Sequence, residues 1–323
     1  MKLSCLVENQ LQDIDQLDLY AAILGESPSR GARSPMLWNR AFSELKTNAL
    51  MIPLDVRPEN FLAVLECLEE DKKFIGGAVA VPFKETTVKW LRSKGPDRLS
   101  PEGEHIGAVN CLFRGRNGQL IGTNTDGEAA LICIKKLVTS LQDLPVLLLG
   151  VGGVGKAIAS YVVSELDDPS LLTICARDNF ANRQFAEKLD ASFDEWPPSD
   201  NLISANRLVI NCTSIGHRQF QHTGTEQKSM SEFSPLALLE KSNLERTREL
   251  ISLTTKDCVF FDAVYDPSPT VLLQEAVKQT REVEDGGRMN LKQAAIAFHY
   301  VVTESPSIDQ IESFMVGQSV SDV

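Results

Sequence analysis

A glycine-rich turn carries the most specific chemical signal in the sequence. The stretch VLLLGVGGVGKAIASYV places Gly150, Gly152 and Gly155 in the pattern G-x-G-x-x-G, between a short apolar strand and a helix. The first glycine permits a tight turn, the second lets the backbone approach a pyrophosphate, and the third lets helix and strand pack closely. The N–H groups of the helix N-terminus then face the phosphates. The turn therefore predicts a dinucleotide site, with Gly153 and Val154 as further contacts.

The next strand of this unit ends where an adenosine ribose would be recognised, at Ala176, Arg177 and Asp178. Arg177 would bind a 2′-phosphate, and Arg183 would extend that basic site. Asp178 would instead repel a phosphate and accept a hydrogen bond from a free 2′-hydroxyl. The two arginines favour NADP, and NAD is the alternative. A glycine turn without a ligand and a loop of solvated charges are the structural alternatives.

A lysine and an aspartate are the candidates for proton transfer. In GAVAVPFKETTVKW an apolar strand ends near Pro82, and Lys84 stands where a helix begins. Ligands of open α/β sheets bind outside the carboxyl ends of the strands, so Lys84 is expected beside a substrate. Asp126 closes a second polar cluster, Asn124-Thr125-Asp126. The structural alternatives are a solvated lysine and a plain helix cap.

The elements that must position these residues follow an α/β pattern, in which apolar runs alternate with helix-period segments. In the first region strands are expected at 18–25, 49–56 and 74–81, helices at 34–45 and 57–71, and a hairpin at 108–125. In the second region strands are expected at 146–149, 171–176, 208–212 and 259–264, after a helix at 126–140, and the last two helices at 288–302 and 307–317. The polar stretch 217–232 is expected to be a surface loop.

These elements predict two domains. Residues 1–125 would form an N-terminal α/β substrate-binding domain, to which 288–323 return, and 126–287 would form a Rossmann-type, doubly wound dinucleotide-binding domain. The length of 323 residues fits two domains better than one. A monomer or a homodimer is expected, and no heptad pattern indicates a coiled coil.

Composition restricts the partners. A net charge of −12 argues against nucleic acid and anionic membranes and favours small molecules. The N-terminal stretch lacks a secretory pattern and no apolar run is long enough to span a bilayer, so a cytoplasmic protein is expected. Seven dispersed cysteines without a C-x-x-C pair are expected to be reduced core residues. Four histidines without a ligand cluster predict no metal.

The ordered set of motifs resembles the shikimate dehydrogenase family, including its quinate-oxidising relatives, over nearly the whole chain. The segments that carry the resemblance are SPMLWNRAF, VPFK, IGAVN, IGTNTDG, LGVGGVGKAIA, VINCTSIG, DAVYDPSPT and MNLKQAAIAF. The resemblance implies an NAD(P)-dependent oxidoreductase that interconverts a ring alcohol and a ketone of a shikimate- or quinate-like cyclic polyol carboxylate. A place in the shikimate pathway of aromatic amino acid biosynthesis would follow.

The resemblance also implies roles for individual residues. Lys84 and Asp126 would form the catalytic pair, in which Lys84 takes the hydroxyl proton and Asp126 holds its ammonium oriented. The substrate contacts would be Ser34, Asn110, Tyr265 and Gln293. The contacts on the nicotinamide side would be Thr213, Ser214 and Gly286. The structural alternatives are a helix cap for Ser34, a strand start for Asn110, a core aromatic for Tyr265 and a surface amide for Gln293.

The sequence departs from the family pattern in the substrate pocket. Ala32 replaces the first serine of S-x-S-P, and Ala78 and Ala80 replace the asparagine and threonine of N-V-T-x-P-F-K. Each hydrogen bond lost to a buried polar group would cost about 1–3 kcal/mol, so shikimate itself is expected to bind poorly without compensation. Arg33 would compensate if its fork turned inward to a carboxylate.

Two other functions fit parts of the sequence. A non-catalytic dinucleotide or metabolite sensor would keep the fold and have no use for an intact Lys84 and Asp126. A different two-domain dehydrogenase that uses a lysine, such as one acting on folate-linked carbon units, would keep the glycine loop.

Overall fold

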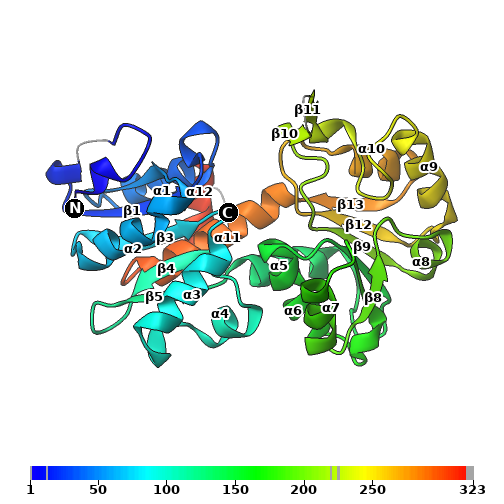
Figure 1. Cartoon of the computed structure of the whole chain (residues 1–323), viewed down its shortest axis with the longest axis horizontal. Coiled ribbons are helices and arrows are strands. Elements are labelled where there is room, and N and C mark those ends of the chain that lie inside the picture. Colours follow the sequence, from blue (N-terminus) through cyan, green and yellow to red (C-terminus); the bar gives the residue numbers. More distant parts are fainter. Residues whose placement is uncertain (1, 12–13, 219, 224–225, 318–323) are drawn as a thin grey trace. The chain divides into compact units, whose positions relative to one another are not determined.

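The computed structural model describes residues 2–11, 14–218, 220–223 and 226–317. The chain forms two compact units, the first made of Met1–Thr125 with Leu291–Val323 and the second of Asp126–Asn290. Figure 1 shows the helices and strands of both units and labels them where there is room. Helix α11 (Gly286–Val301) begins in the second unit and ends in the first.

The first unit is built on a five-stranded sheet. Its strands are β1 (Leu19–Gly25), β2 (Ala49–Asp55), β3 (Phe74–Val79), β4 (Cys111–Arg114) and β5 (Leu120–Thr123). They lie in the order β2-β1-β3-β4-β5, in which β1, β2 and β3 are parallel and β4 is antiparallel to both of its neighbours. The expected hairpin at 108–125 is confirmed as β4 and β5.

Helices cover both faces of this sheet. They are α1 (Ser34–Glu44), α2 (Phe61–Glu70), α3 (Lys84–Lys94), α4 (Pro101–Ile106), α11 and α12 (Ile308–Val316). Successive residues of β1 point to opposite faces, so that Tyr20 packs in a core with α2 and α3, and Ala21 packs in a core with α1, α11 and α12. The three parallel strands therefore end at one edge, where α1 and α3 begin.

The second unit is a doubly wound sheet of six parallel strands. They are β6 (Val146–Leu149), β7 (Leu172–Ala176), β8 (Ser192–Glu195), β9 (Leu208–Asn211), β12 (Val259–Asp262) and β13 (Glu282–Asp285). The order β13-β12-β9-β6-β7-β8 reverses between β6 and β9, which is the switch point at which ligands of such sheets bind. The prediction of an α/β fold with a Rossmann-type unit is confirmed.

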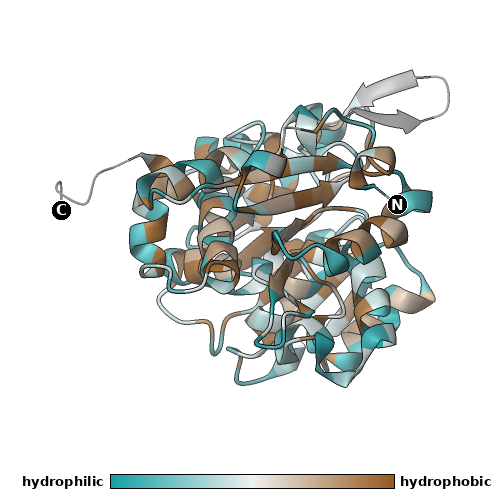
Figure 2. Ribbon diagram, turned by 90° about the vertical axis from the view of Figure 1, so that its left-hand side faces the viewer, coloured by the Kyte–Doolittle hydropathy of each residue, from teal (hydrophilic) through white to brown (hydrophobic). Residues whose placement is uncertain are grey.

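Six helices accompany these strands: the first precedes β6, and the other five connect the strands. They are α5 (Asp126–Leu137), α6 (Gly153–Val163), α7 (Phe180–Lys188), α8 (Asp200–Ala205), α9 (Asn243–Leu253) and α10 (Val271–Lys278). One apolar core joins α8, α9 and α10 to β6, β9 and β12, while α5 packs on α6. In Figure 2 the sheet strands are largely apolar, whereas the helices carry residues of both kinds.

Three expectations from the sequence were wrong. The stretch 217–232 is not only a loop, since it contains the antiparallel strands β10 (Phe220–Thr223) and β11 (Glu226–Ser229); residues 219, 224 and 225 lie outside the described part. Strands β8 and β13 were not expected, because their short polar sequences lack an apolar run. Cys5 is exposed, although the cysteines were expected in the core.

Two features are absent from the part of the chain that the structure describes: a helix able to cross a membrane and a cluster of metal-ligating side chains. Within 2–11, 14–218, 220–223 and 226–317, no helix has both the length and the apolar content that a bilayer crossing requires. In the same ranges no three His, Cys, Asp or Glu side chains gather closely enough to hold a metal ion.

Candidate active site

In the first unit, Lys84 lies at the edge where the parallel strands end. It is the first residue of α3, five positions after the end of β3, and only 8% of its surface is exposed. Its backbone carbonyl accepts a hydrogen bond of 3.0 Å from the N–H of Val109. Burial of an amine is unfavourable unless polar groups surround it, which sets Lys84 apart from a solvated surface lysine.

A buried hydrogen-bond network around Asn110 and Thr125 lies in the same unit as this lysine. Asn110 donates from Nδ2 to Thr125 Oγ1 at 3.1 Å and accepts at Oδ1 from the N–H of Thr125 at 2.8 Å. Thr125 Oγ1 in turn donates to the backbone carbonyl of Gln293 at 3.2 Å. These hydrogen bonds place the backbone of Lys84 beside Val109 and the backbone of Gln293 beside Thr125, so both chain segments adjoin the segment that carries Asn110.

The loop between β1 and α1 carries the predicted carboxylate contacts. Buried Asp55, the last residue of β2, accepts hydrogen bonds from the N–H of Ser29 at 2.9 Å and from its hydroxyl at 2.5 Å. Arg33 is the N-cap of α1 and Ser34, which is 6% exposed, is its first residue. The alternative that Ser34 caps this helix is therefore wrong. Asp55 was missed because its partner lies 26 residues away.

In the second unit the glycine loop has the backbone that close approach requires. Gly150 has a φ of +88°, in the region that favours glycine. A Cβ on Gly155 would lie 2.1 Å from the carbonyl oxygen of Gly150, whereas a Cβ on Gly152 would meet no described atom within 4 Å. Gly153 begins α6, and Val154 follows it. The open space at Gly152, beside a helix N-terminus, fits a pyrophosphate.

The end of β7 resolves part of the conflict at the ribose position. Arg183 binds both oxygens of Asp178, at 2.5 and 2.9 Å, and stacks on Phe193 with its guanidinium carbon 4.8 Å from the ring centre. The bonds from Arg183 lower the pKa of the Asp178 carboxyl. Arg183 is thus engaged by Asp178, and Arg177 is the exposed cation that directly follows buried Ala176. This balance of charge reduces the repulsion that Asp178 alone would exert on a 2′-phosphate.

Asp126 and Gly127 begin α5 in the second unit, and Asp126 is 5% exposed. A Cβ on Gly127 would lie 2.6 Å from the carbonyl oxygen of Ala157, so α5 approaches α6 closely here. Desolvation, and then the carboxylates of Asp262 and Asp126, raise the pKa of the Cys212 thiol well above its usual range. Asp126 therefore lies near the carboxyl end of β9, on the side of the sheet where the glycine loop lies.

The remaining predicted contacts of the second unit follow strands β9, β12 and β13 in the chain. Thr213 is partly exposed and Ser214 is exposed. Tyr265 is half-buried and meets the ring of His217 edge-on, with ring centres 6.0 Å apart. Gly286 begins α11 and donates its N–H to the carbonyl of Val264 at 3.1 Å.

A buried carboxyl, Asp262, was missed from the sequence. It ends β12, is fully buried, and accepts hydrogen bonds from Thr270 Oγ1 at 2.7 Å, Asn211 Nδ2 at 2.8 Å and the N–H of Val264 at 2.9 Å. Burial raises its pKa from 3.8 to about 7, although these three bonds lower it. A usable signal existed, since Asn211 and Asp262 are polar residues that directly follow the apolar cores of two predicted strands.

The raised pKa of Asp262 predicts a pH dependence of stability. The folded protein binds a proton at Asp262 more tightly than the unfolded chain does. The contribution of Asp262 to the free energy of unfolding should therefore be fully present below pH 3.8 and be lost as pH rises through about 7. The two pKa values correspond to about 4 kcal/mol at most. Urea unfolding of wild type and of Asp262→Asn, at a series of pH values between 3.8 and about 7, measures how the free energy of unfolding changes with pH. In a plot of unfolding free energy against pH, the variant should have a shallower slope than wild type. Equal slopes would contradict the raised pKa of Asp262.

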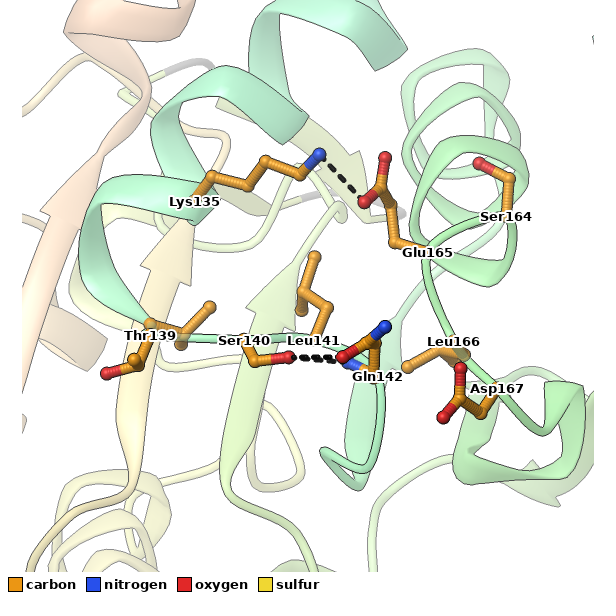
Figure 3. A pocket seen from close by; sticks show the side chains of 10 residues that line it. Lys135, Thr139, Ser140, Leu141, Gln142, Ser164, Glu165, Leu166 and Asp167 are labelled. Carbon is orange, nitrogen blue, oxygen red and sulfur yellow. Dashed lines mark hydrogen bonds and ion pairs between the residues drawn. The ribbon is translucent and has the colours of Figure 1, made fainter.

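A cavity of about 500 Å³ lies elsewhere in the second unit (Figure 3). Its rim carries an ion pair of 2.7 Å between Lys135 and Glu165 and a hydrogen bond from the N–H of Gln142 to Ser140. The segments that line it precede β6 and β7, so it lies at the amino ends of these strands. It is therefore separate from the glycine loop at the carboxyl ends.

Fold and site together define a class of protein. A doubly wound sheet with a glycine loop at its switch point is the architecture of dinucleotide-binding units. The first unit contributes the buried Lys84 and the amide group of Asn110 at the edge of its own sheet, as a substrate-binding unit would. The class is that of two-unit proteins built to bind a dinucleotide and a small polar molecule.

Comparisons with known proteins identify the family. The model of the shikimate dehydrogenase substrate binding domain matches residues 24–112. A protein of Methanobrevibacter smithii named shikimate dehydrogenase (NADP(+)) is 30% identical over 296 residues, which cover 88% of this chain and 92% of that protein. The protein of the same name from Methanocaldococcus jannaschii is 26% identical over 292 residues, 90% and 93% of the two chains. The chain belongs to the shikimate dehydrogenase family.

Solved structures agree with this assignment. The shikimate 5-dehydrogenase of Thermus thermophilus, crystallised in complex with NADP(H) and shikimate, superposes with a TM-score of 0.72 at 25% identity, over 93% of this chain and 99% of that one. The quinate dehydrogenase of Corynebacterium glutamicum, at 21% identity and a TM-score of 0.72, shares the fold. The resemblance inferred from the motifs is confirmed.

Proposed function

We propose that the chain is an NADP-dependent oxidoreductase that interconverts a ring alcohol and a ketone of a shikimate- or quinate-like cyclic polyol carboxylate. The observation that carries the proposal is the coexistence of two intact half-sites. One has the buried Lys84 beside the Asn110 network, and the other has a glycine loop with open space at Gly152. The family relatives named shikimate dehydrogenase (NADP(+)) support the cofactor and the substrate class.

Lys84 is assigned the proton transfer. Oxidation of a secondary alcohol requires the hydroxyl proton to leave as the carbon is oxidised, and a positioned amine accepts it. In the reverse direction the ammonium of Lys84 donates that proton to the carbonyl oxygen. Asp126, which is also buried, is assigned the orientation of this ammonium.

The second unit is assigned the cofactor. When bound, NADP supplies the group that accepts the hydride. The residues that would hold it are Gly150, Gly152, Gly153, Val154 and Gly155 at the pyrophosphate, Ala176, Arg177 and Asp178 at the ribose, and Thr213, Ser214 and Gly286 at the nicotinamide. Arg177 would bind the 2′-phosphate, because Arg183 balances the charge of Asp178.

The proposed substrate pocket offers fewer hydrogen-bonding side chains than the family pattern does. Ala32, Ala78 and Ala80 are partly buried and pack against the apolar core of the first unit, so methyl groups stand where the family pattern has polar side chains. Ser34, Asn110, Tyr265 and Gln293 are the polar contacts, and Arg33 is the proposed carboxylate partner. A less hydroxylated ring carboxylate fits this pocket better than shikimate.

The test is turnover of NADP with a panel of ring alcohols, including shikimate, quinate and their methyl esters. We expect reduction of NADP with at least one free carboxylate, and a KM that rises about tenfold or more in Arg33→Ala, because a charged hydrogen bond is lost. Arg30→Ala, which removes an exposed arginine three residues away, is the matched control. Equal KM values in wild type and Arg33→Ala would remove Arg33 from the pocket.

Dinucleotide binding without turnover of any ring alcohol would refute the enzymatic proposal and favour a sensor.

The cytoplasmic location and the monomeric or homodimeric state also stay predictions.

A further inference from the structure

The network around Asp262 extends from the core of the second unit to its surface. Asn211 donates to Asp262 and accepts at Oδ1 from both the N–H of Thr213, at 2.9 Å, and its hydroxyl, at 2.7 Å. Thr213 Oγ1 accepts from the N–H of Ile215 at 3.1 Å, and Asn211 Nδ2 also donates to the carbonyl of Ile215 at 3.1 Å. The loop from Thr213 to Ile215 is thus shaped by one asparagine, which Asp262 orients.

The same network reaches the glycine loop and the start of α11. A Cβ on Gly150 would lie 2.7 Å from Thr213 Cγ2, so this methyl group packs directly on the first glycine. On the other side, Asp262 accepts from the N–H of Val264, whose carbonyl accepts from the N–H of Gly286. One carboxyl therefore connects three segments that are assigned to the cofactor.

Simple stabilisation is a poor explanation for this carboxyl. Among the residues that the structure describes, no lysine or arginine pairs with Asp262, and its three hydrogen-bond donors, from Asn211, Val264 and Thr270, are neutral. Burying a carboxyl without a cation is unfavourable, and an apolar residue in its place often stabilises a protein. Three donors converging on one carboxyl do, however, fix the directions of the segments that supply them.

We propose that Asp262 is a positioning residue for the nicotinamide half of the cofactor site, acting through Asn211 on Thr213 and through Val264 on Gly286. The proposal rests on the proposed NADP-dependent function. Thr270 belongs to the same hydrogen-bond network, because its hydroxyl donates to the second carboxyl oxygen of Asp262. Neither Asp262 nor Thr270 contacts the cofactor in this assignment.

The test compares Thr270→Val, which keeps the shape and removes the hydroxyl, with Thr270→Ser, which keeps the hydroxyl. Calorimetry measures the binding of NADP and of adenosine 2′,5′-bisphosphate, which has only the adenine half of the cofactor. In Thr270→Val we expect the Kd of NADP to rise about tenfold, because a buried acceptor loses its donor, and the Kd of the bisphosphate to stay within twofold. Thr270→Ser should bind both as wild type does.

The control accounts for helix capping, since Thr270 Oγ1 also accepts from the N–H of Leu273 at 3.4 Å. Ser199→Ala removes an N-cap from α8 in the same unit and should leave both Kd values unchanged. Hydrogen exchange of the free protein is the second measurement, and residues 213–216 should exchange faster in Thr270→Val.

The outcomes are distinct. Equal losses for NADP and the bisphosphate in Thr270→Val, or no loss for either, would overturn the positioning role. Wild-type protein that binds neither molecule would overturn the proposed function and this inference with it. Selective loss for NADP, restored by serine, supports both.

Discussion

Replacing Lys84 by alanine should lower kcat for ring-alcohol oxidation by about 10²–10⁴-fold, the usual contribution of a positioned acid or base. The Kd of NADP should stay within about twofold, because the residues assigned to the dinucleotide belong to the other unit. Stopped-flow turnover with NADP and calorimetric binding, on the same preparations, measure the two quantities. A small amine added to the buffer should restore part of the lost rate, since it replaces the missing base.

Helix α3 supplies the matched control for this experiment. Lys89 lies five residues further along the same helix and is exposed, whereas Lys84 is buried. Lys89→Ala removes the same charge from the protein and should leave kcat unchanged. If Lys84→Ala retains kcat within fivefold of wild type, or if Lys89→Ala loses as much, Lys84 is not the proton-transfer group.

The location of Lys84 illustrates what the sequence predicts well. An apolar run, a proline and a helix-compatible segment follow one another within fourteen residues, so the strand-to-helix junction is a local property. The glycine loop is equally local, because each glycine is required by the backbone geometry of the same strand–turn–helix segment. The fold class followed from the same alternation of strands and helices.

The missed parts depend on distant residues. Strands β8 and β13 are the two edges of their sheet, and their sequences, SFDE and EVED, become strands because a neighbour pairs with them. The bond between Asn211 and Asp262 joins residues 51 positions apart and requires the register of two parallel strands. Hydrogen-bond partners of this kind follow from tertiary packing, which local pattern does not determine.

The glycine loop provides the second large effect. Gly152→Ala should leave the thermal midpoint of unfolding nearly unchanged, because its backbone is extended, with φ −69° and ψ −173°, and no described atom lies within 4 Å of the new Cβ. The same methyl group should raise the Kd of NADP by about a hundredfold, since it would stand where the pyrophosphate approaches the backbone. Thermal unfolding and calorimetry check the two halves of this expectation.

Gly155→Ala separates packing from binding in the same loop. Its Cβ would lie 2.1 Å from the carbonyl oxygen of Gly150 and 3.2 Å from Cys212 Cβ, so backbone must move to accept it. We expect a loss of stability of about 1–3 kcal/mol, as for overpacking in a core. If Gly152→Ala instead lowered stability while NADP bound as in wild type, the open space beside Gly152 would not be the pyrophosphate site. The opposite behaviour of two glycines three residues apart therefore distinguishes a ligand cradle from a merely tight turn.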